Sequence, residues 1–227
     1  MSHLTRGSSF VVIQFLACLF LWSCQSSRAF DPRAERVDVE KGSLVLVSLR
    51  TRNDHRPDYT PHVDQLVFES IGAPATPGGS AKRTFVAVVS AQPAETPIPV
   101  ERVGWYAAQL PPGEYRLTKI KGSSQTFWVR GWFSWPVDWS FRLAPGEVLH
   151  LGDGSMVNRK RAKGEERSGG IFPIVDQSVS GYAESTFDVA LSPADANSAA
   201  GFRRKYKALA EVELAPTSNA QGHAPRP

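Results

Sequence analysis

The sequence predicts a mainly β protein, an antiparallel β-sandwich with one C-terminal α-helix. Three observations favour this fold class. Short runs of β-branched and aromatic residues, separated by turn residues, recur along most of the chain. Two Pro–Gly turns that lie 33 residues apart each lead into such a run. Helical spacing of apolar residues is clear in one segment, near the C-terminus.

The composition agrees with a globular domain. The 227 residues are 41% hydrophobic and 21% charged, which excludes a fully disordered, collagen-like or disulfide-framework protein. No apolar run reaches the roughly 20 residues of a membrane-spanning helix, which excludes a polytopic membrane protein. The net charge of +4 requires no polyanionic partner, and we expect no nucleic-acid binding.

Residues 1–23 are predicted to be a lipoprotein signal peptide. Arg6 supplies a positive charge ahead of Phe10–Trp22, an apolar run of 13 residues that Gln14 interrupts. That length suits the hydrophobic region of a signal peptide and is too short to cross a bilayer as a helix. An ordinary cleaved secretory signal and an uncleaved anchor are the alternatives.

The end of this run, Leu21-Trp22-Ser23-Cys24, resembles the bacterial lipobox. In that motif a Leu lies three residues before the Cys and a small residue directly precedes it; Trp22 departs from the pattern at the middle position. The resemblance implies a lipid attached to Cys24 and a protein held to a membrane of the bacterial cell envelope. Phe15-Leu16-Ala17-Cys18 is a second candidate motif. Gln25, in place of Asp after the Cys, implies delivery to the outer membrane, facing the periplasm.

Residues 24–34, rich in Ser, Arg and Ala, are predicted to be a tether, and residues 35–215 one β-sandwich domain. Leu44–Leu49 is a nearly continuous apolar run, as expected for a strand that is covered on both faces. Val137–Leu143 alternates apolar and polar residues, as expected for a strand with one face in the core. Further strands are predicted at Val63–Phe68, Phe85–Val89, Trp105–Leu110, Tyr115–Ile120, Val148–Leu151 and Ile171–Val175.

The helix is predicted over about 193–209. Ser192 can cap it, and Pro193 suits the first helical position. Three apolar residues share one face at helical spacing: Phe202, Tyr206 and Leu209. Residues 216–227 are rich in Pro and Ala and have no apolar anchor, so they are predicted to be a disordered tail.

Two segments are alike, Leu110-Pro111-Pro112-Gly113-Glu114-Tyr115 and Leu143-Ala144-Pro145-Gly146-Glu147-Val148. Each contains the Pro–Gly pair of a type II turn. Together with the later pair Gly152-Asp153, they resemble the corners of uncharacterised bacterial lipoproteins with a transthyretin-like (prealbumin-type) β-sandwich. The match covers about 105–155. It implies a sandwich fold and a location at the cell surface, and it brings no catalytic residues.

The segment Trp128–Trp139 is rich in aromatic residues and is either a binding surface or part of the core. Trp139 belongs to the alternating strand and is predicted to be buried. Gly131 and Pro136 bracket two other rings, which predicts a loop that exposes them. Exposed rings can bind a sugar, anchor a protein partner or rest in a lipid interface, or they can simply cover the end of the sandwich. The candidate ligand-binding residues are Trp132 and Trp135.

Motifs for catalysis are lacking, since no Gly-x-Ser-x-Gly elbow or phosphate-binding loop appears. Asp54–Asp64 gathers two His (His55 and His62) and three Asp but has no H-x-x-x-H spacing, so a solvated loop is predicted and a metal site is the alternative. His150 is predicted to be structural. Asn158–Arg167, with five cations and two anions, is predicted to be a hydrated hairpin tip, with anionic lipid headgroups or lipopolysaccharide as the alternative ligand.

We therefore expect a non-enzymatic, lipid-anchored lipoprotein of the bacterial cell envelope. It would present a binding or scaffolding surface to an envelope protein partner, with no cofactor and no metal. A carbohydrate-binding accessory module that uses Trp132 and Trp135 is the alternative, and a hydrolytic or metal-dependent enzyme is the third hypothesis. A pocket that joins His62, His150 and a carboxylate would favour the enzyme.

Overall fold

The computed structural model describes residues 28–38, 40, 42–71, 83–88, 100–126, 128–216 and 221–223. The predicted signal peptide (1–23), Cys24 and Gln25 lie outside the described residues. Lipid attachment therefore stays a prediction.

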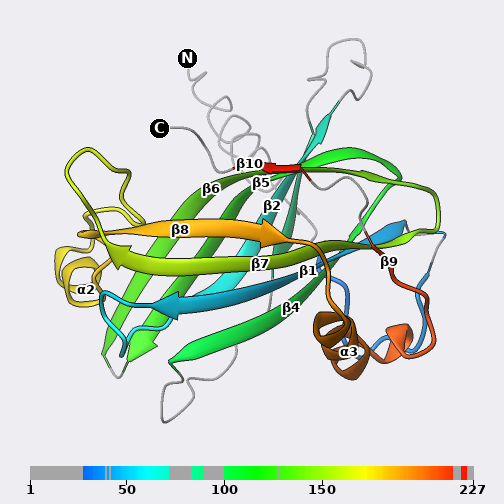
Figure 1. Ribbon diagram of the computed structural model, residues 1–227, viewed down its shortest axis with the longest axis horizontal. Helices are drawn as coiled ribbons and strands as arrows, with labels where there is room; N and C mark the ends of the chain where they lie inside the picture. The colour runs from blue at the N-terminus through cyan, green and yellow to red at the C-terminus, as the bar shows by residue number, and fades with distance from the viewer. Residues whose placement is uncertain are drawn as a thin grey trace, which may run out of the picture.

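Two β-sheets pack face to face in a sandwich-like arrangement (Figure 1). The strands are β1 (Ser43–Asn53), β2 (His62–Ile71), β3 (Thr84–Val88), β4 (Glu101–Leu110), β5 (Gly113–Thr126), β6 (Val129–Leu143), β7 (Val148–Lys160), β8 (Ser185–Ser192), β9 (Ala215–Pro216) and β10 (Gln221–His223). The helices are α2 (Ile174–Val179), α3 (Ala196–Lys205) and the 3-10 helix η1 (Lys207–Leu209). The first sheet has the order β4-β1-β7-β8, with β9 also paired to β7, and the second has the order β10-β6-β5-β2-β3. The prediction of a mainly β protein is confirmed.

The first sheet is mixed rather than fully antiparallel. Strands β1 and β7 pair in parallel, whereas β1 and β4, and β7 and β8, are antiparallel. Parallel neighbours need a long crossover connection between them. Here the chain passes through the second sheet between β1 and β7, which supplies that connection and corrects the prediction of a purely antiparallel sandwich.

The main core lies between the two sheets. Leu49 of β1 and Met156 of β7 belong to the same buried cluster as Leu66 of β2 and Phe141 of β6. Trp139 is part of this cluster, so its predicted place in the core is confirmed. Full burial of a side chain of this size stabilises a fold by about 1.5–3 kcal/mol, so these residues hold the two sheets together.

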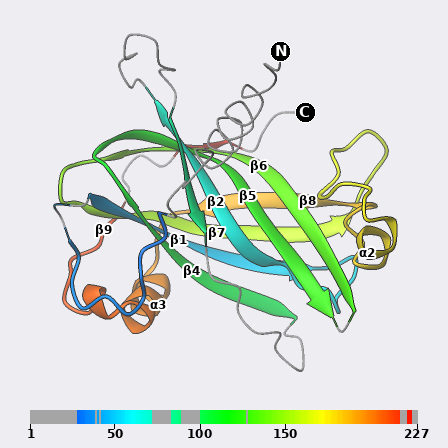
Figure 2. The same ribbon diagram turned by 180° about the vertical axis from the view of Figure 1, so that it is seen from behind.

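A second apolar cluster covers part of the outer face of the first sheet. Leu44 and Leu46 of β1 cluster there with Phe202 and Tyr206 from the C-terminal helical region, and with Phe30. The first part of β1 is therefore buried on both faces, which confirms the expectation from its continuous apolar run. Figure 2 shows α3 beside one end of the first sheet, so the other end of the outer face is left uncovered by it.

Segments near both ends of the described chain extend the sheets. Ala29 forms a bridge with Ala108 of β4, and Phe30 N donates to Ala107 O (2.9 Å). Residues 28–30 of the predicted tether are thus paired with β4. The predicted disordered tail contains β10, which pairs with β6 at Asp138–Ser140. Strand edges carry unpaired backbone groups, and these short segments satisfy some of them.

The C-terminal helix is shorter than predicted, and a further helix takes the place of a strand. α3 begins at Ala196, and its cap is Asp195 rather than Ser192, because the Asp195 carboxylate accepts from Ser198 N (2.7 Å). The segment predicted as the strand Ile171–Val175 is a loop that enters α2. An apolar run this short does not distinguish a strand from the start of a helix.

The predicted loop at Trp132–Trp135 is also wrong, because β6 runs unbroken through Gly131 and Pro136. Pro136 lies beside a register shift opposite Leu117–Lys119, and strands tolerate proline at such bulges. The second Pro–Gly corner is a turn with a φ of 71° at Gly146, as predicted. The first is not a type II turn, since Gly113 has a φ of 157° and begins β5.

Candidate functional site

A β-bulge in β7 brings two polar side chains to one face of the first sheet. His150 pairs with Leu46 of β1 and Asp153 pairs with Ser48, so three steps along β7 match two steps along β1. Without the extra residue, His150 and Asp153 would lie on opposite faces. Gly152, inside the bulge, has a φ of 141°, and a Cβ there would lie 2.5 Å from the Ser192 carbonyl oxygen. The bulge therefore requires glycine at this position.

Asp153 ties the bulge to α3. Its Oδ1 accepts a hydrogen bond from Ser48 Oγ. Its Oδ2 accepts from Asp195 N (2.9 Å) and Ser198 Oγ (3.0 Å), which are the cap and the first turn of α3. Hydrogen bonds to an ionised carboxylate are about twice as strong as neutral ones. Asp153 therefore fixes where α3 begins on the sheet.

His150 lies next to the Asp153 carboxylate, on the side that is buried under α3. The residue is 2% exposed, and its ring meets Phe202 edge-on with centroids 5.0 Å apart. His150 Nε2 lies 3.5 Å from Asp153 Oδ1 and 3.5 Å from Ser198 Oγ. Burial lowers the pKa of His150, while the nearby Asp153 and Asp195 act in the opposite direction. The contacts agree with the predicted structural role.

These side chains do not form a Ser–His–Asp catalytic relay. In such a relay the serine and the aspartate bond to opposite ring nitrogens. Here both lie beside Nε2 of His150, and the Ser198 hydroxyl donates hydrogen bonds to Asp153 Oδ2 and the Asp195 carbonyl oxygen. The other histidine of the enzyme hypothesis, His62, lies in β2 of the second sheet, where its Nε2 is 3.7 Å from Asp64. The structure does not bring His62 and His150 together.

A cleft of about 450 Å³ opens on the solvent side of Asp153. Its floor is the outer face of β4, β1 and β7, and one wall is the N-terminal turn of α3. The register of the three strands places their cleft residues in two rows. The first row is Trp105, Ser48 and Asp153, and the second is Val103, Arg50 and Ser155. The cleft begins where the apolar residues under α3 give way to polar ones.

α2 lies at the end of the sandwich opposite α3 (Figure 1), and exposed apolar side chains gather on it and in the loop before it. Phe172 is 78% exposed, and four neighbours in sequence are also exposed: Ile171, Ile174, Val175 and Val179. We call these five residues the α2 surface. Exposed apolar side chains gathered in one place mark interaction sites more often than scattered ones do.

Two side chains of α2 fasten it to the start of β6. Gln177 is buried; its Oε1 accepts from Trp132 N (2.9 Å) and its Nε2 donates to Trp132 O (2.9 Å). The Asp176 carboxylate accepts from Arg130 N (2.9 Å). Gln177 thus pairs with the edge of β6 as a neighbouring strand would. The α2 surface is held in place while its apolar side chains face solvent.

The two predicted ligand-binding tryptophans have different surroundings. Trp132 is 41% exposed and lies under the Arg130 guanidinium, 5.7 Å from the ring centroid. Trp135 is 6% exposed and packs edge-on against Phe187 in the core. The two rings therefore do not form an exposed platform. Trp128, in the turn before β6, is 95% exposed.

The loop that joins β1 to β2 lies beside the α2 surface. Buried Asn53 organises it: its Oδ1 accepts from Arg56 N (2.8 Å) and its Nδ2 donates to Tyr59 O (2.9 Å). A pocket of about 560 Å³ lies between this loop and Val179. Burial and Arg56 lower the pKa of His55. Within the described ranges, no group of three or more His, Cys, Asp or Glu is placed to hold a metal ion.

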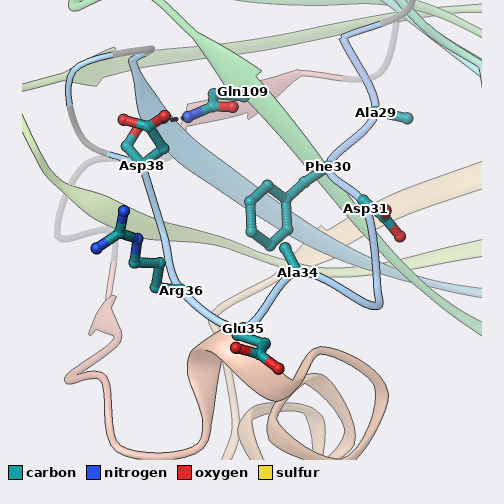
Figure 3. A pocket seen from close by; sticks show the side chains of 8 residues that line it. All are labelled: Ala29, Phe30, Asp31, Ala34, Glu35, Arg36, Asp38 and Gln109. Carbon is teal, nitrogen blue, oxygen red and sulfur yellow. Dashed lines mark hydrogen bonds between the residues drawn. The ribbon is translucent and has the colours of Figure 1, made fainter.

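A third pocket, of about 780 Å³, lies where the N-terminal segment folds over β4 (Figure 3). Phe30 lies in its wall, and Gln109 Nε2 donates to Asp38 O (2.7 Å). Its remaining walls mix alanines with charges of both signs, which defines no single ligand chemistry.

The cationic segment is only partly a hairpin tip. Asn158 belongs to β7 and is buried, and its Nδ2 donates to Ser185 Oγ (2.9 Å). Arg159 donates to both carboxylate oxygens of Glu165 (2.8 Å each), and this pairing lowers the pKa of Glu165 to about 2. The residues after Lys160 form the connection toward α2, as predicted for a hydrated loop.

The cleft and the α2 surface were both missed by reasoning from the sequence. Asp153 reaches the cleft through a bulge, which shifts the side-chain alternation without leaving a reliable trace in the sequence. The α2 surface has a signal in the sequence, because Ile171–Val175 is an apolar run, but that run predicts a strand rather than the start of a helix. The sequence predicts a strand that contains Trp105 but does not show on which face of the sheet its side chain lies.

Comparison of the chain with protein-family models, with curated proteins and with solved structures finds no match. Across the described stretches, none of the helices combines the length and the hydropathy needed for a membrane crossing.

Proposed function

We propose that this chain is a lipid-anchored, non-enzymatic lipoprotein of the bacterial cell envelope that presents the α2 surface to a protein partner. The observation that carries the proposal is the exposure of five apolar side chains on α2 and in the loop that enters it, where buried Gln177 fixes the helix to β6. A rigid apolar surface can bind without a large loss of conformational entropy. The two-sheet body agrees with a transthyretin-like domain, which we include in the proposal.

The position of this surface favours a protein partner over the anchoring membrane. The chain joins the sandwich at Arg28, whose carbonyl accepts from Gln109 N near the end of β4. Three residues lie between Cys24 and Arg28, and the four steps of the chain from one to the other reach at most about 14 Å. α2 contacts the start of β6, which pairs with the far end of β5, a strand of 14 residues that spans roughly 45 Å. In this proposal the α2 surface faces away from the bilayer that holds the lipid.

The border of the α2 surface carries charges of both signs. The chain approaches it through a segment with three cations, Arg161, Lys163 and Arg167, and two anions, Glu165 and Glu166. The pocket beside Val179 is lined by Arg56, Asp58 and Glu184. A complementary partner would present an apolar patch bordered by mixed charges. The pocket beside Val179 could receive one of its side chains.

Site-specific photocrosslinking in living cells tests the docking proposal. The full chain carries a photoreactive amino acid at Val175 or, as a matched control, at exposed Glu211 near the opposite end. We expect a discrete protein adduct from Val175 that Phe172→Glu abolishes and that Glu211 does not form. Identical adducts from both positions, or a lipid adduct from Val175, would contradict the proposal.

The anchor needs a separate measurement. We expect metabolic labelling with palmitate to mark the wild-type chain and to fail with Cys24→Ala, which should be released from the membrane fraction. Unlabelled wild-type chain that is freely secreted would exclude the lipid anchor and leave the α2 result to be judged on its own.

A further inference from the structure

We infer that the cleft between α3 and the outer face of β4, β1 and β7 binds a neutral saccharide. This site lies on the outer face of the first sheet beside α3, shares no residue with the α2 surface and is independent of the proposed docking function.

The chemistry of the lining favours a neutral, hydroxyl-rich ligand. Asp153 and Asp195 contribute two negative charges, and Arg50 and Arg204 contribute two positive charges, so the cleft has no net formal charge. Carboxylates accept hydrogen bonds and guanidinium groups donate them, and a sugar hydroxyl can do both. Three of these groups are already engaged within the chain: Arg50 donates to Glu101 Oε1 (2.6 Å), and Asp153 and Asp195 accept at α3. A charged ligand would therefore meet charges of both signs that offset one another, whereas a neutral polyol needs only the hydrogen-bonding groups that remain.

Several polar groups remain available to such a ligand. The side chains of Ser155, Ser192 and Asn197 line the cleft and form no side-chain hydrogen bond with the described part of the chain. Asp153, in contrast, is committed to Ser48, Asp195 and Ser198. We therefore assign ligand hydrogen bonding mainly to the three uncommitted side chains and a positioning role to Asp153.

Trp105 and Val103 supply an apolar wall for the C–H face of a sugar ring. Trp105 is half-buried, and α3 fixes its indole: a Cβ at Gly201 would lie 2.0 Å from Trp105 Nε1, so the helix approaches the ring as closely as glycine permits. The Arg204 guanidinium lies 5.9 Å from the ring centroid. A ring held in one orientation loses little rotamer entropy when a ligand binds.

The size and the setting agree with this ligand class. A volume of about 450 Å³ lies within the roughly 300–1,000 Å³ range of small-molecule sites. A β-bulge forms one side of the cleft, and bulges recur beside binding sites because they redirect a side chain. The cleft would hold a mono- or disaccharide unit, either free or as part of a longer glycan.

Calorimetry on the full chain tests the inference. The protein is extracted in a detergent that contains no sugar and titrated separately with maltose, cellobiose and chitobiose. We expect at least one disaccharide to bind. The double substitution Ser155→Ala/Asn197→Ala removes two hydrogen-bonding groups and should weaken binding about tenfold. Trp105→Phe, which keeps an aromatic ring, should weaken it less than Trp105→Ala.

The matched control is Trp128→Ala, which removes the most exposed aromatic ring at the opposite end. It should leave the affinity unchanged, and thermal unfolding of each variant shows that the fold persists. Absence of binding heat for all three disaccharides would overturn the inference. So would an equal loss of affinity in Trp128→Ala, since that result would move the sugar to the α2 end.

Discussion

Ser198 Oγ and Asp153 Oδ2 lie 3.0 Å apart and join the first turn of α3 to a bulge in β7. The two residues are 45 positions apart in the chain. Their contact joins the start of the helix to the first sheet at this point. The area that the helix leaves uncovered is the cleft, so this hydrogen bond links the stability of the fold to the shape of the site.

Removing the Asp153 carboxylate should be costly. Asp153→Ala leaves two donors, Ser48 Oγ and Asp195 N, without their acceptor, while Ser198 Oγ can still donate to the Asp195 carbonyl oxygen (2.9 Å). We expect the free energy of unfolding to fall by about 3 kcal/mol, since hydrogen bonds to charged groups contribute about 1.5–3 kcal/mol each and water compensates part of the loss. Urea denaturation followed by circular dichroism measures it. The exposed carboxylate of Asp138, paired with Arg116, is the control, and Asp138→Ala should change stability by less than about 1 kcal/mol.

Stability should decrease on mild acidification because of His150. Its pKa in the folded chain is lowered from 6.5 by burial, so the unfolded chain binds a proton first as the pH falls. The contribution to stability is therefore complete above about pH 7 and is lost as the pH falls through 6.5 toward the lowered folded-state pKa. His150→Gln should flatten this part of the profile of unfolding free energy against pH.

His55, whose pKa is also lowered, should contribute separately to the same loss of stability, and His55→Gln should remove its share. If the slope of unfolding free energy against pH were unaltered in both variants, the assignment to these two histidines would be refuted.

The sequence predicts those parts of the fold in which the pattern of apolar residues along one strand is enough to show which faces are buried. The alternation in Val137–Leu143 and the continuous run in Leu44–Leu49 predicted their burial, because one or two covered faces leave a direct pattern in the sequence. Pro136 suggested a loop because its compatibility with β6 depends on a bulge opposite β5. Asp153 was missed for the same reason. Contacts that depend on a change of register cannot be read from periodicity.

The aromatic segment offers a direct comparison of two rings three residues apart. Trp135 packs against Phe187 in the core, and its replacement by alanine should cost about 3–5 kcal/mol. Trp132 is stacked under Arg130 and partly exposed, so Trp132→Ala should cost about 1 kcal/mol or less. Chemical denaturation of the two variants under the same conditions gives the comparison. Equal losses would mean that the two rings are equally buried.

The contact between α3 and Trp105 predicts an unusual response to a helix-favouring substitution. Alanine in place of a helical glycine normally stabilises by about 1 kcal/mol. At position 201 the added methyl would overlap the indole of Trp105, so we expect Gly201→Ala to destabilise by about 1–3 kcal/mol instead. The double variant Gly201→Ala/Trp105→Ala should recover part of that loss relative to the sum of the single variants. Additive losses would show that the helix and the ring are not in close contact.

The attachment of α2 can be separated from its apolar surface. Gln177→Ala removes both side-chain hydrogen bonds to Trp132, and we expect faster amide hydrogen exchange at Trp132 and throughout α2, by about tenfold or more, since each buried bond contributes roughly 1 kcal/mol. Phe172→Ser, in contrast, changes an exposed side chain. It should leave the exchange rates unchanged and the unfolding free energy within about 0.5 kcal/mol of wild type. If Phe172→Ser destabilised the protein as much as Gln177→Ala, the ring would be packing against the body of the sandwich. It would then be unavailable to a partner, and the α2 surface would be part of the fold rather than a site for docking.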